Sequence, residues 1–147
     1  MRCTPTLLVA PLLLVGLSSA IVAQDRPYTE GPVVNVSYIR IKPGMFDKYM
    51  KYLDTDYKRN MEAQKKAGII LDHAVYSSPQ SREDDWNMVL SITYKNMAGL
   101  DSLRDKTEPV TVRTLNATPE RLAQLNIERG EMRDLVGSRL LRQLILK

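Results

Sequence analysis

Hydrophobic and polar positions alternate most regularly over residues 86–95. A period of two predicts a strand with one apolar face, and that face carries Trp86, Met88, Leu90, Ile92 and Tyr94. Segments rich in β-branched or apolar residues predict three more strands, at residues 33–42, 69–77 and 139–147. The turn-forming pair Pro43-Gly44 closes the first of these. The chain therefore has four predicted strands.

Helical spacing separates these strands. Over residues 45–67 the apolar positions recur at steps of three and four, which predicts a long amphipathic helix that packs on the sheet and ends at Gly68. A short helix is predicted over residues 97–104, and Thr118-Pro119-Glu120 begins another that ends at Gly137. Residues 105–115, which include a proline, are expected to be extended or a loop.

This order of elements predicts an α+β fold, a ferredoxin-like βαββαβ arrangement with an extra helix before the last strand. Its helices cover one face of the sheet. If Val34, Val36 and Tyr38 face the helices, the opposite face is half apolar, with Asn35, Ser37, Ile39 and Ile41 beside Asn87, Val89, Ser91 and Thr93. We expect a second copy of the chain to cover this face, which gives a homodimer.

The first 23 residues have the parts of a secretory signal peptide. Arg2 precedes an apolar run at residues 7–17, and small residues follow, with cleavage expected after Ala20 or Ala23. A retained membrane anchor is the alternative, but the run contains Pro11 and is shorter than the roughly 20 residues that span a bilayer. We expect export to the periplasm or secretion, a flexible lead-in at residues 24–32, one domain at residues 33–147, and no membrane contact after cleavage.

Composition limits the partners, covalent links and metal sites that the mature chain can have. The net charge of +4 comes from bases interspersed with acids, so no nucleic-acid partner is expected. The one cysteine, Cys3, leaves with the signal peptide, which excludes disulfides and thiol chemistry from the mature chain. One histidine and no mature cysteine give no ligand set for a transition metal, and we predict neither a metal site nor a cofactor.

Two groups of residues are candidates for function. His73 is the one side chain whose ordinary titration range lies near neutral pH, so it is the candidate catalytic acid or base. The alternative is a histidine packed in its strand. Polar groups on the expected open face are candidates for ligand binding, and they are Asn35, Ser37, Asn87, Ser91 and Thr93. The alternative for these is a wet sheet face or a dimer contact.

The segment Tyr38-Ile39-Arg40-Ile41-Lys42-Pro43-Gly44 and the strand at residues 86–94 resemble the dimeric α/β-barrel superfamily. Its members include antibiotic-biosynthesis monooxygenase-like and NIPSNAP-like groups, and no single group is assigned. The resemblance implies paired ferredoxin-like domains, often with a pocket for a small aromatic or hydrophobic molecule. The haem-degrading branch uses an Asn, a Trp and a His. Asn35 and Trp86 are present, but His73 lies on a strand and not on the second helix, which departs from that pattern.

Three functions remain open at this point. The first is a homodimer that binds a small molecule between its paired sheets. The second is a cofactor-independent monooxygenase-like enzyme with His73 or a pocket tyrosine as its base. The third is a structural module that uses the open sheet face to bind another protein.

Overall fold

Four antiparallel strands form one sheet in the order β2-β3-β1-β4 in the computed structural model, which describes residues 26–79, 82 and 85–147. The strands are β1 (Tyr28–Ile41), β2 (Asp72–Ser77), β3 (Met88–Tyr94) and β4 (Arg133–Leu146). Because β3 pairs antiparallel with both β1 and β2, those two strands run parallel on either side of it. This is the split βαβ order of a ferredoxin-like sheet, so the predicted fold class is confirmed.

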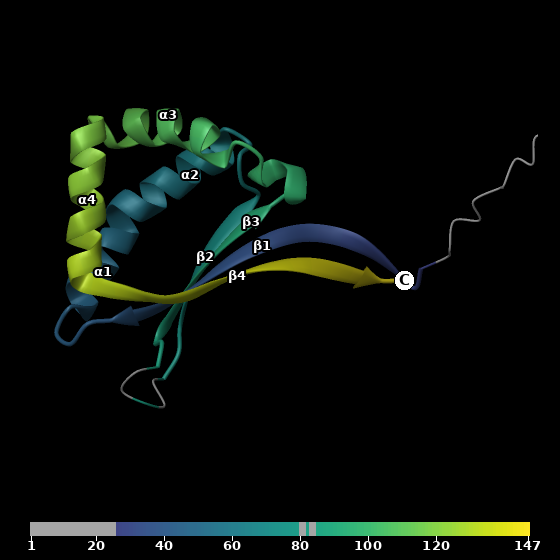
Figure 1. The fold of residues 1–147 in the computed structure, drawn as a ribbon, viewed down its shortest axis with the longest axis horizontal. Coiled ribbons are helices and arrows are strands. Elements are labelled where there is room, and N and C mark those ends of the chain that lie inside the picture. The colour runs from purple at the N-terminus through teal and green to yellow at the C-terminus, as the bar shows by residue number, and fades with distance from the viewer. Residues whose placement is uncertain (1–25, 80–81, 83–84) are drawn as a thin grey trace, which may run out of the picture.

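All helices lie on one side of the sheet (Figure 1). The first helix runs without a break through α1 (Phe46–Tyr52), the π-helical turn η1 (Leu53–Tyr57) and α2 (Lys58–Lys66). The second helical region comprises η2 (Met97–Leu100), α3 (Leu103–Leu115) and α4 (Pro119–Met132). The extra helix before the last strand is therefore present, as α4.

Two glycines set the ends of the first helix. Pro43 and Gly44 occupy the centre of a turn closed by a 3.0 Å hydrogen bond from the Met45 amide to the Lys42 carbonyl, and Gly44 has a φ of 74°. At the other end Gly68 has a φ of 71°, which a residue with a side chain rarely adopts. The predicted turn and the predicted helix end are both confirmed.

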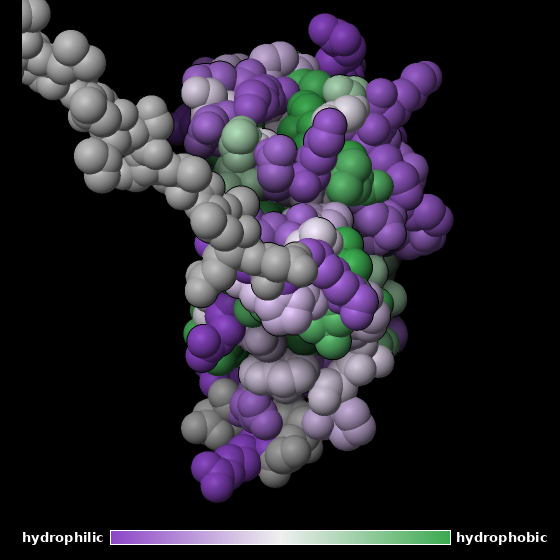
Figure 2. All heavy atoms as spheres, turned by 90° about the vertical axis from the view of Figure 1, so that its right-hand side faces the viewer, coloured by the Kyte–Doolittle hydropathy of each residue, from purple (hydrophilic) through white to green (hydrophobic). Residues whose placement is uncertain are grey.

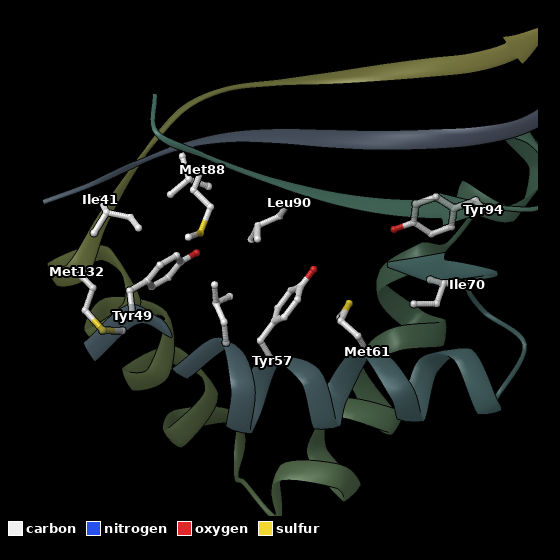
Figure 3. Close-up of a cluster of buried hydrophobic side chains, with 11 residues drawn as sticks. Ile41, Tyr49, Tyr57, Met61, Ile70, Met88, Leu90, Tyr94 and Met132 are labelled. Carbon is white, nitrogen blue, oxygen red and sulfur yellow. The ribbon is translucent and has the colours of Figure 1, made fainter. Parts of the chain in front are cut away.

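The core lies between the first helix and the sheet (Figure 3). Tyr49 and Tyr57 point from the helix toward the strands, where they meet Met88 and Leu90 of β3. The predicted apolar face of β3 is buried at Met88, Leu90 and Tyr94, and the predicted helix stripe supplies buried side chains to the same cluster. The two periodicities in the sequence therefore identified the two surfaces that pack together.

The two faces of β1 are the reverse of the predicted ones. Residues paired directly across antiparallel strands share a face, and Ile39 pairs with the buried Met88 whereas Val36 pairs with Ser91. Ile39 and Ile41 thus lie in the core on the helix-covered face. The open face carries Val34, Val36 and Tyr38 of β1 with Val89, Ser91 and Thr93 of β3.

Trp86 also differs from its predicted place. It precedes β3, and its ring lies 5.2 Å from the ring of Tyr38, on the side of the sheet away from the helices. Alternation along a strand fixes the face of a residue only while the strand is regular, and Trp86 lies outside the regular part.

Two boundaries differ from the sequence-based ones because distant segments pair, and residues 105–115 differ in type. Tyr28 pairs with Leu146, so β1 includes residues 28–32 of the expected flexible lead-in. Arg133 pairs with Ile41, so β4 begins where the helical pattern was expected to continue. Residues 105–115 are helical, and Pro109 is tolerated because it lies on the exposed side of α3, where water can hydrate the carbonyl that lacks its partner.

The predicted signal peptide, residues 1–23, lies outside the described residues. Among the helices of the described ranges, none has both the length and the apolar character needed to cross a bilayer.

The core assignment predicts a large stability difference between two Ala variants. Met88 is almost completely buried, so Met88→Ala should lower the free energy of unfolding by about 2–5 kcal/mol because it leaves a cavity. Ile127 on α4 is 58% exposed, and Ile127→Ala should change the free energy of unfolding by about 0.5 kcal/mol or less. Urea denaturation followed by circular dichroism measures both. Equal losses in the two variants would contradict this core.

Candidate functional site

A cavity of about 550 Å³ lies between the first helix and the second helical region, beside β3. Ile92 of β3 contributes to its sheet side and Tyr57, Asn60 and Met61 to its first-helix side. The remaining walls come from α3 and α4, which include Thr111, Leu115, Leu122, Leu125 and Arg129. The space arises because α3 covers the first helix without burying any of its own residues completely. Of its sixteen lining residues, nine are apolar or tyrosine and seven are polar or charged.

Two polar atoms of the lining residues are buried without a hydrogen-bond partner within the described chain. They are the hydroxyl oxygen of Tyr57 and the Oδ1 atom of Asn60. An unpaired buried polar atom costs about 1–3 kcal/mol, so proteins rarely keep one without a reason. Tyr57 and Asn60 lie one helical turn apart on the first helix, and both residues line the cavity, although these two atoms are themselves covered by the surrounding protein.

Tyr57 is a neutral donor in this environment. Burial is the largest cause of a raised pKa for its hydroxyl, and Tyr49, Tyr52 and Tyr94 raise the pKa further. The proton therefore stays on the oxygen at neutral pH. Tyr57 can donate a hydrogen bond to a ligand but is poorly suited to remove a proton from one, which disfavours it as the base of an enzyme.

Charged residues around the cavity are mostly paired with one another. Arg104 and Glu108 of α3 form an ion pair of 3.0 Å, and Asp56 pairs with Arg59 at 3.1 Å. Arg129 of α4 differs, because its guanidinium lies 2.8 Å from the Oδ1 atom of Asn126 and 3.5 Å from the hydroxyl of Tyr52. Those two partners are uncharged.

His73 lies directly behind a cavity wall. It pairs with Ile92 across β2 and β3, so it is on the helix-covered face, an orientation that the sequence left undecided. Its Nε2 atom is 3.0 Å from Glu62 Oε1, its ring is edge-on to Tyr57 at 5.9 Å, and its Nδ1 atom is buried without a partner among the described atoms. The side chain is 13% exposed. His73 is therefore next to the cavity but contacts it through Tyr57, and its catalytic role stays a prediction.

The five polar residues predicted to bind a ligand do not come together in one site. Asn35 and Ser37 pair with Ile92 and Leu90, which places them on the helix-covered side, whereas Ser91 and Thr93 belong to the open face. Asn35 Oδ1 accepts a 3.0 Å hydrogen bond from Ser138, a residue of β4.

Asn87 has a structural partner as well. Its Oδ1 atom accepts a 3.0 Å hydrogen bond from the backbone amide of Ile41, which ties the start of β3 to the end of β1. Ligand contact by these five residues stays a prediction, and the separation argues against one binding site made of all five.

A second hollow of about 520 Å³ lies on the open face beside Tyr38, Trp86 and Arg139. None of the buried, unpaired side-chain atoms in the described chain belongs to a residue of this hollow. This hollow is more open to solvent than the cavity among the helices, which is therefore the stronger candidate.

Sequence reasoning missed Asn60 and Arg129. A signal for Asn60 was present, because it lies three residues after Tyr57 on the apolar stripe of the first helix, where a polar residue is unexpected. Arg129 gave no signal, since its meeting with Tyr52 depends on the packing of α4. Within the described ranges, no three His, Cys, Asp or Glu side chains gather in a way that could hold a metal ion.

Neither a protein-family model nor a curated protein matches the chain. HapK from Hahella chejuensis is a similar solved structure, with 13% identity and a TM-score of 0.51 over 76% of this chain and 91% of HapK. A dimeric ferredoxin-like protein from an uncultured marine organism has 9% identity and a TM-score of 0.52 over 80% of this chain and 90% of its own. The chain has a ferredoxin-like fold. This agrees with the superfamily resemblance, and identities this low concern the fold alone.

The raised pKa of Tyr57 predicts that this tyrosine does not ionise when the folded ferredoxin-like domain is titrated to alkaline pH. At about pH 11 the folded protein should keep the Tyr57 proton, so Tyr57→Phe should leave its phenolate absorbance unchanged. In denaturant the same variant should lose the signal of one of seven tyrosines. Because only the unfolded state releases this proton, the variant should also lose less stability than the parent as the pH rises above about 10. A lower phenolate signal in the folded variant would contradict the assignment.

Proposed function

We propose that this chain is an exported homodimeric protein that binds a small, largely apolar molecule in the cavity between its first helix and its second helical region. The observation that carries the proposal is the cavity between the first helix, α3 and α4, whose walls combine apolar side chains with polar ones. A volume of about 550 Å³ falls within the usual range for ligand sites, which combine apolar linings with a few placed polar groups. Export is proposed from residues 1–23, which have the composition of a signal peptide.

The dimer is proposed from the apolar surface that β4 leaves exposed. This strand is a sheet edge of 14 residues, and an edge with many exposed apolar side chains is prone to associate. The exposed ones are Leu135, Val136, Leu140, Leu141, Leu144, Ile145 and Leu146. Figure 2 views the molecule from the side toward which β1 and β4 extend and shows apolar surface among hydrophilic residues.

A second copy is the occupant that best fits this surface. The open face next to β4 is itself half apolar, and an isologous contact would bury both surfaces at once. The similar protein from an uncultured marine organism, named a dimeric ferredoxin-like protein, supports this choice.

An enzyme of the cofactor-independent monooxygenase-like type is the second candidate. It is favoured by the contact between His73 and Glu62, a histidine–carboxylate pair that lies behind a cavity wall. It ranks second because the neutral Tyr57 stands between that pair and the cavity.

Filling the cavity should abolish ligand retention. Thr111 lines the cavity from α3, so Thr111→Trp should remove the extra mass that native mass spectrometry finds on the mature protein purified from its own host. Arg113 is exposed on the same helix, and Arg113→Trp is the matched control that should keep the extra mass. A protein with no retained mass in either form, and no binding of added aromatic probes, would refute the cavity as a ligand site.

A charge placed on the proposed dimer surface should separate the subunits. Leu141 is 48% exposed on β4, and Leu141→Glu should shift the protein from dimer to monomer in sedimentation velocity because the carboxylate would be buried without a partner. Phe46 is 52% exposed at the start of α1, so Phe46→Glu should leave the dimer intact. A parent protein that sediments as a monomer would contradict the proposal.

A further inference from the structure

We propose that α3 is a hinged lid on the cavity, which swings as a rigid helix about Ser102 and Asn116 and lets a ligand enter and leave. The inference rests on the proposed function and adds the route by which the ligand is exchanged. Thr111 and Leu115 belong to the wall that α3 contributes, so a movement of this helix would open the cavity on that side.

The two ends of α3 share an uncommon backbone conformation. Ser102 directly precedes the helix and has a φ of 50°, and Asn116 directly follows it and has a φ of 48°. Among the residues that the structure describes, these are the two that carry a side chain and have a positive φ. This conformation is costly for such residues, so both positions have a favourable alternative. Residues at the ends of an element that can change φ and ψ in this way serve as hinges.

The alternative conformation of Ser102 would give α3 a helix cap. A serine at the start of a helix usually has an extended backbone and accepts a hydrogen bond from an amide of the first turn. Thr118 does this for α4, with a ψ of 165° and a 3.3 Å hydrogen bond from the Arg121 amide. The side chain of Ser102 does not cap α3. Release of its left-handed conformation would therefore remove strain and allow the missing cap to form as α3 swings away.

Polar side-chain contacts do not tie α3 to its neighbours. The ion pair of Arg104 with Glu108 and the hydrogen bonds that the Thr107 and Thr111 hydroxyls donate all stay within the helix. In the described ranges, no other hydrogen bond or ion pair joins an α3 side chain to another element. None of its residues is completely buried. Apolar contacts, chiefly with α2, are therefore what holds the helix in place.

The chain on either side of the hinges is held more firmly than α3 itself. Ala117, directly after Asn116, is buried, and Leu100 and Leu103 pack against the core cluster. Leu103 is the first residue of α3, so we expect the helix to pivot at that end. Figure 1 shows α3 at the top of the helical layer, beyond α2 as seen from the sheet, where it can move outward without displacing another element.

Pulsed electron paramagnetic resonance between two spin labels tests the movement. The mature chain has no cysteine after Cys3 leaves with the signal peptide, so Lys106→Cys on α3 and Lys58→Cys on α2 give one labelled pair. We expect two distances between these labels in the parent protein. Ser102→Gly should favour the shorter distance, because glycine adopts a positive φ without strain, and Ser102→Pro should favour the longer one, because proline fixes φ at about −65°. A reference pair on α2 and α4, Lys58→Cys with Gln124→Cys, should keep one distance in every protein.

The release of a bound aromatic probe, 2-naphthoate, tests what the movement does. Stopped-flow fluorescence should show release slowed by about threefold or more in Ser102→Gly and accelerated by about as much in Ser102→Pro, because release requires the open lid. Ser77→Gly is the matched control. It makes the same change at an exposed residue of β2 and should leave the release rate unchanged.

Each outcome decides a different claim. A single distance in the parent and in both Ser102 variants, or equal release rates in the three proteins, would overturn the lid and leave the cavity in place. Two distances together with rapid amide exchange throughout residues 107–112 would mean that α3 unfolds instead of swinging, which also overturns the lid. Binding of 2-naphthoate to none of the proteins would overturn the ligand site, and the distances would still decide whether α3 moves. If Ser102→Pro does not fold by circular dichroism, Asn116→Val replaces it, because a β-branched residue also disfavours a positive φ.

Discussion

The pairing of β1 with β3 is the constraint on which the rest of the structure depends. It aligns Ile39 with Met88 and Ser37 with Leu90, so that one face of the central strands is apolar enough to bury the first helix. A shift of one residue in that register would exchange the two faces of β1 and move its isoleucines out of the core. The helix stripe, the cavity and the exposed face all follow from this alignment.

The first helix occupies the apolar face, and the second helical region closes over it incompletely. Tyr57 and Asn60 are one turn apart on the first helix, and both residues line the space that remains. Because α3 has no fully buried residue, its side chains do not fill this space. The cavity is therefore a consequence of how α3 and α4 pack against the first helix, and polar lining residues such as Asn126 and Arg129 distinguish it from an apolar packing defect.

Much of this arrangement could be predicted from the sequence, because local signals carry it. The apolar alternation of β3, the stripe of the first helix and the turn at Gly44 gave the layers and the chain order. The faces of β1 could not be predicted in the same way, since both its even and its odd positions include β-branched residues and only the partner strand decides between them.

The candidate site was harder to predict for a physical reason. A ligand pocket expected on the open face depends on which polar residues share a face, and Asn35 and Ser37 proved to be on the other side of the sheet from Ser91 and Thr93. The meeting of Arg129 with Tyr52 joins residues 77 positions apart, and helix packing alone produces it. Local periodicity contains no information about such contacts.

The claim that a ligand binds in the cavity among the helices, and not in the hollow of the open face, is tested most directly by methyl NMR. The side-chain methyl groups of Met61 and Ile92 line the cavity, whereas those of Val136 and Leu141 lie on β4, and Val136 borders the open-face hollow. We predict that 2-naphthoate shifts the resonances of Met61 and Ile92 and leaves those of Val136 and Leu141 in place. Shifts confined to Val136 and Leu141 would contradict the account.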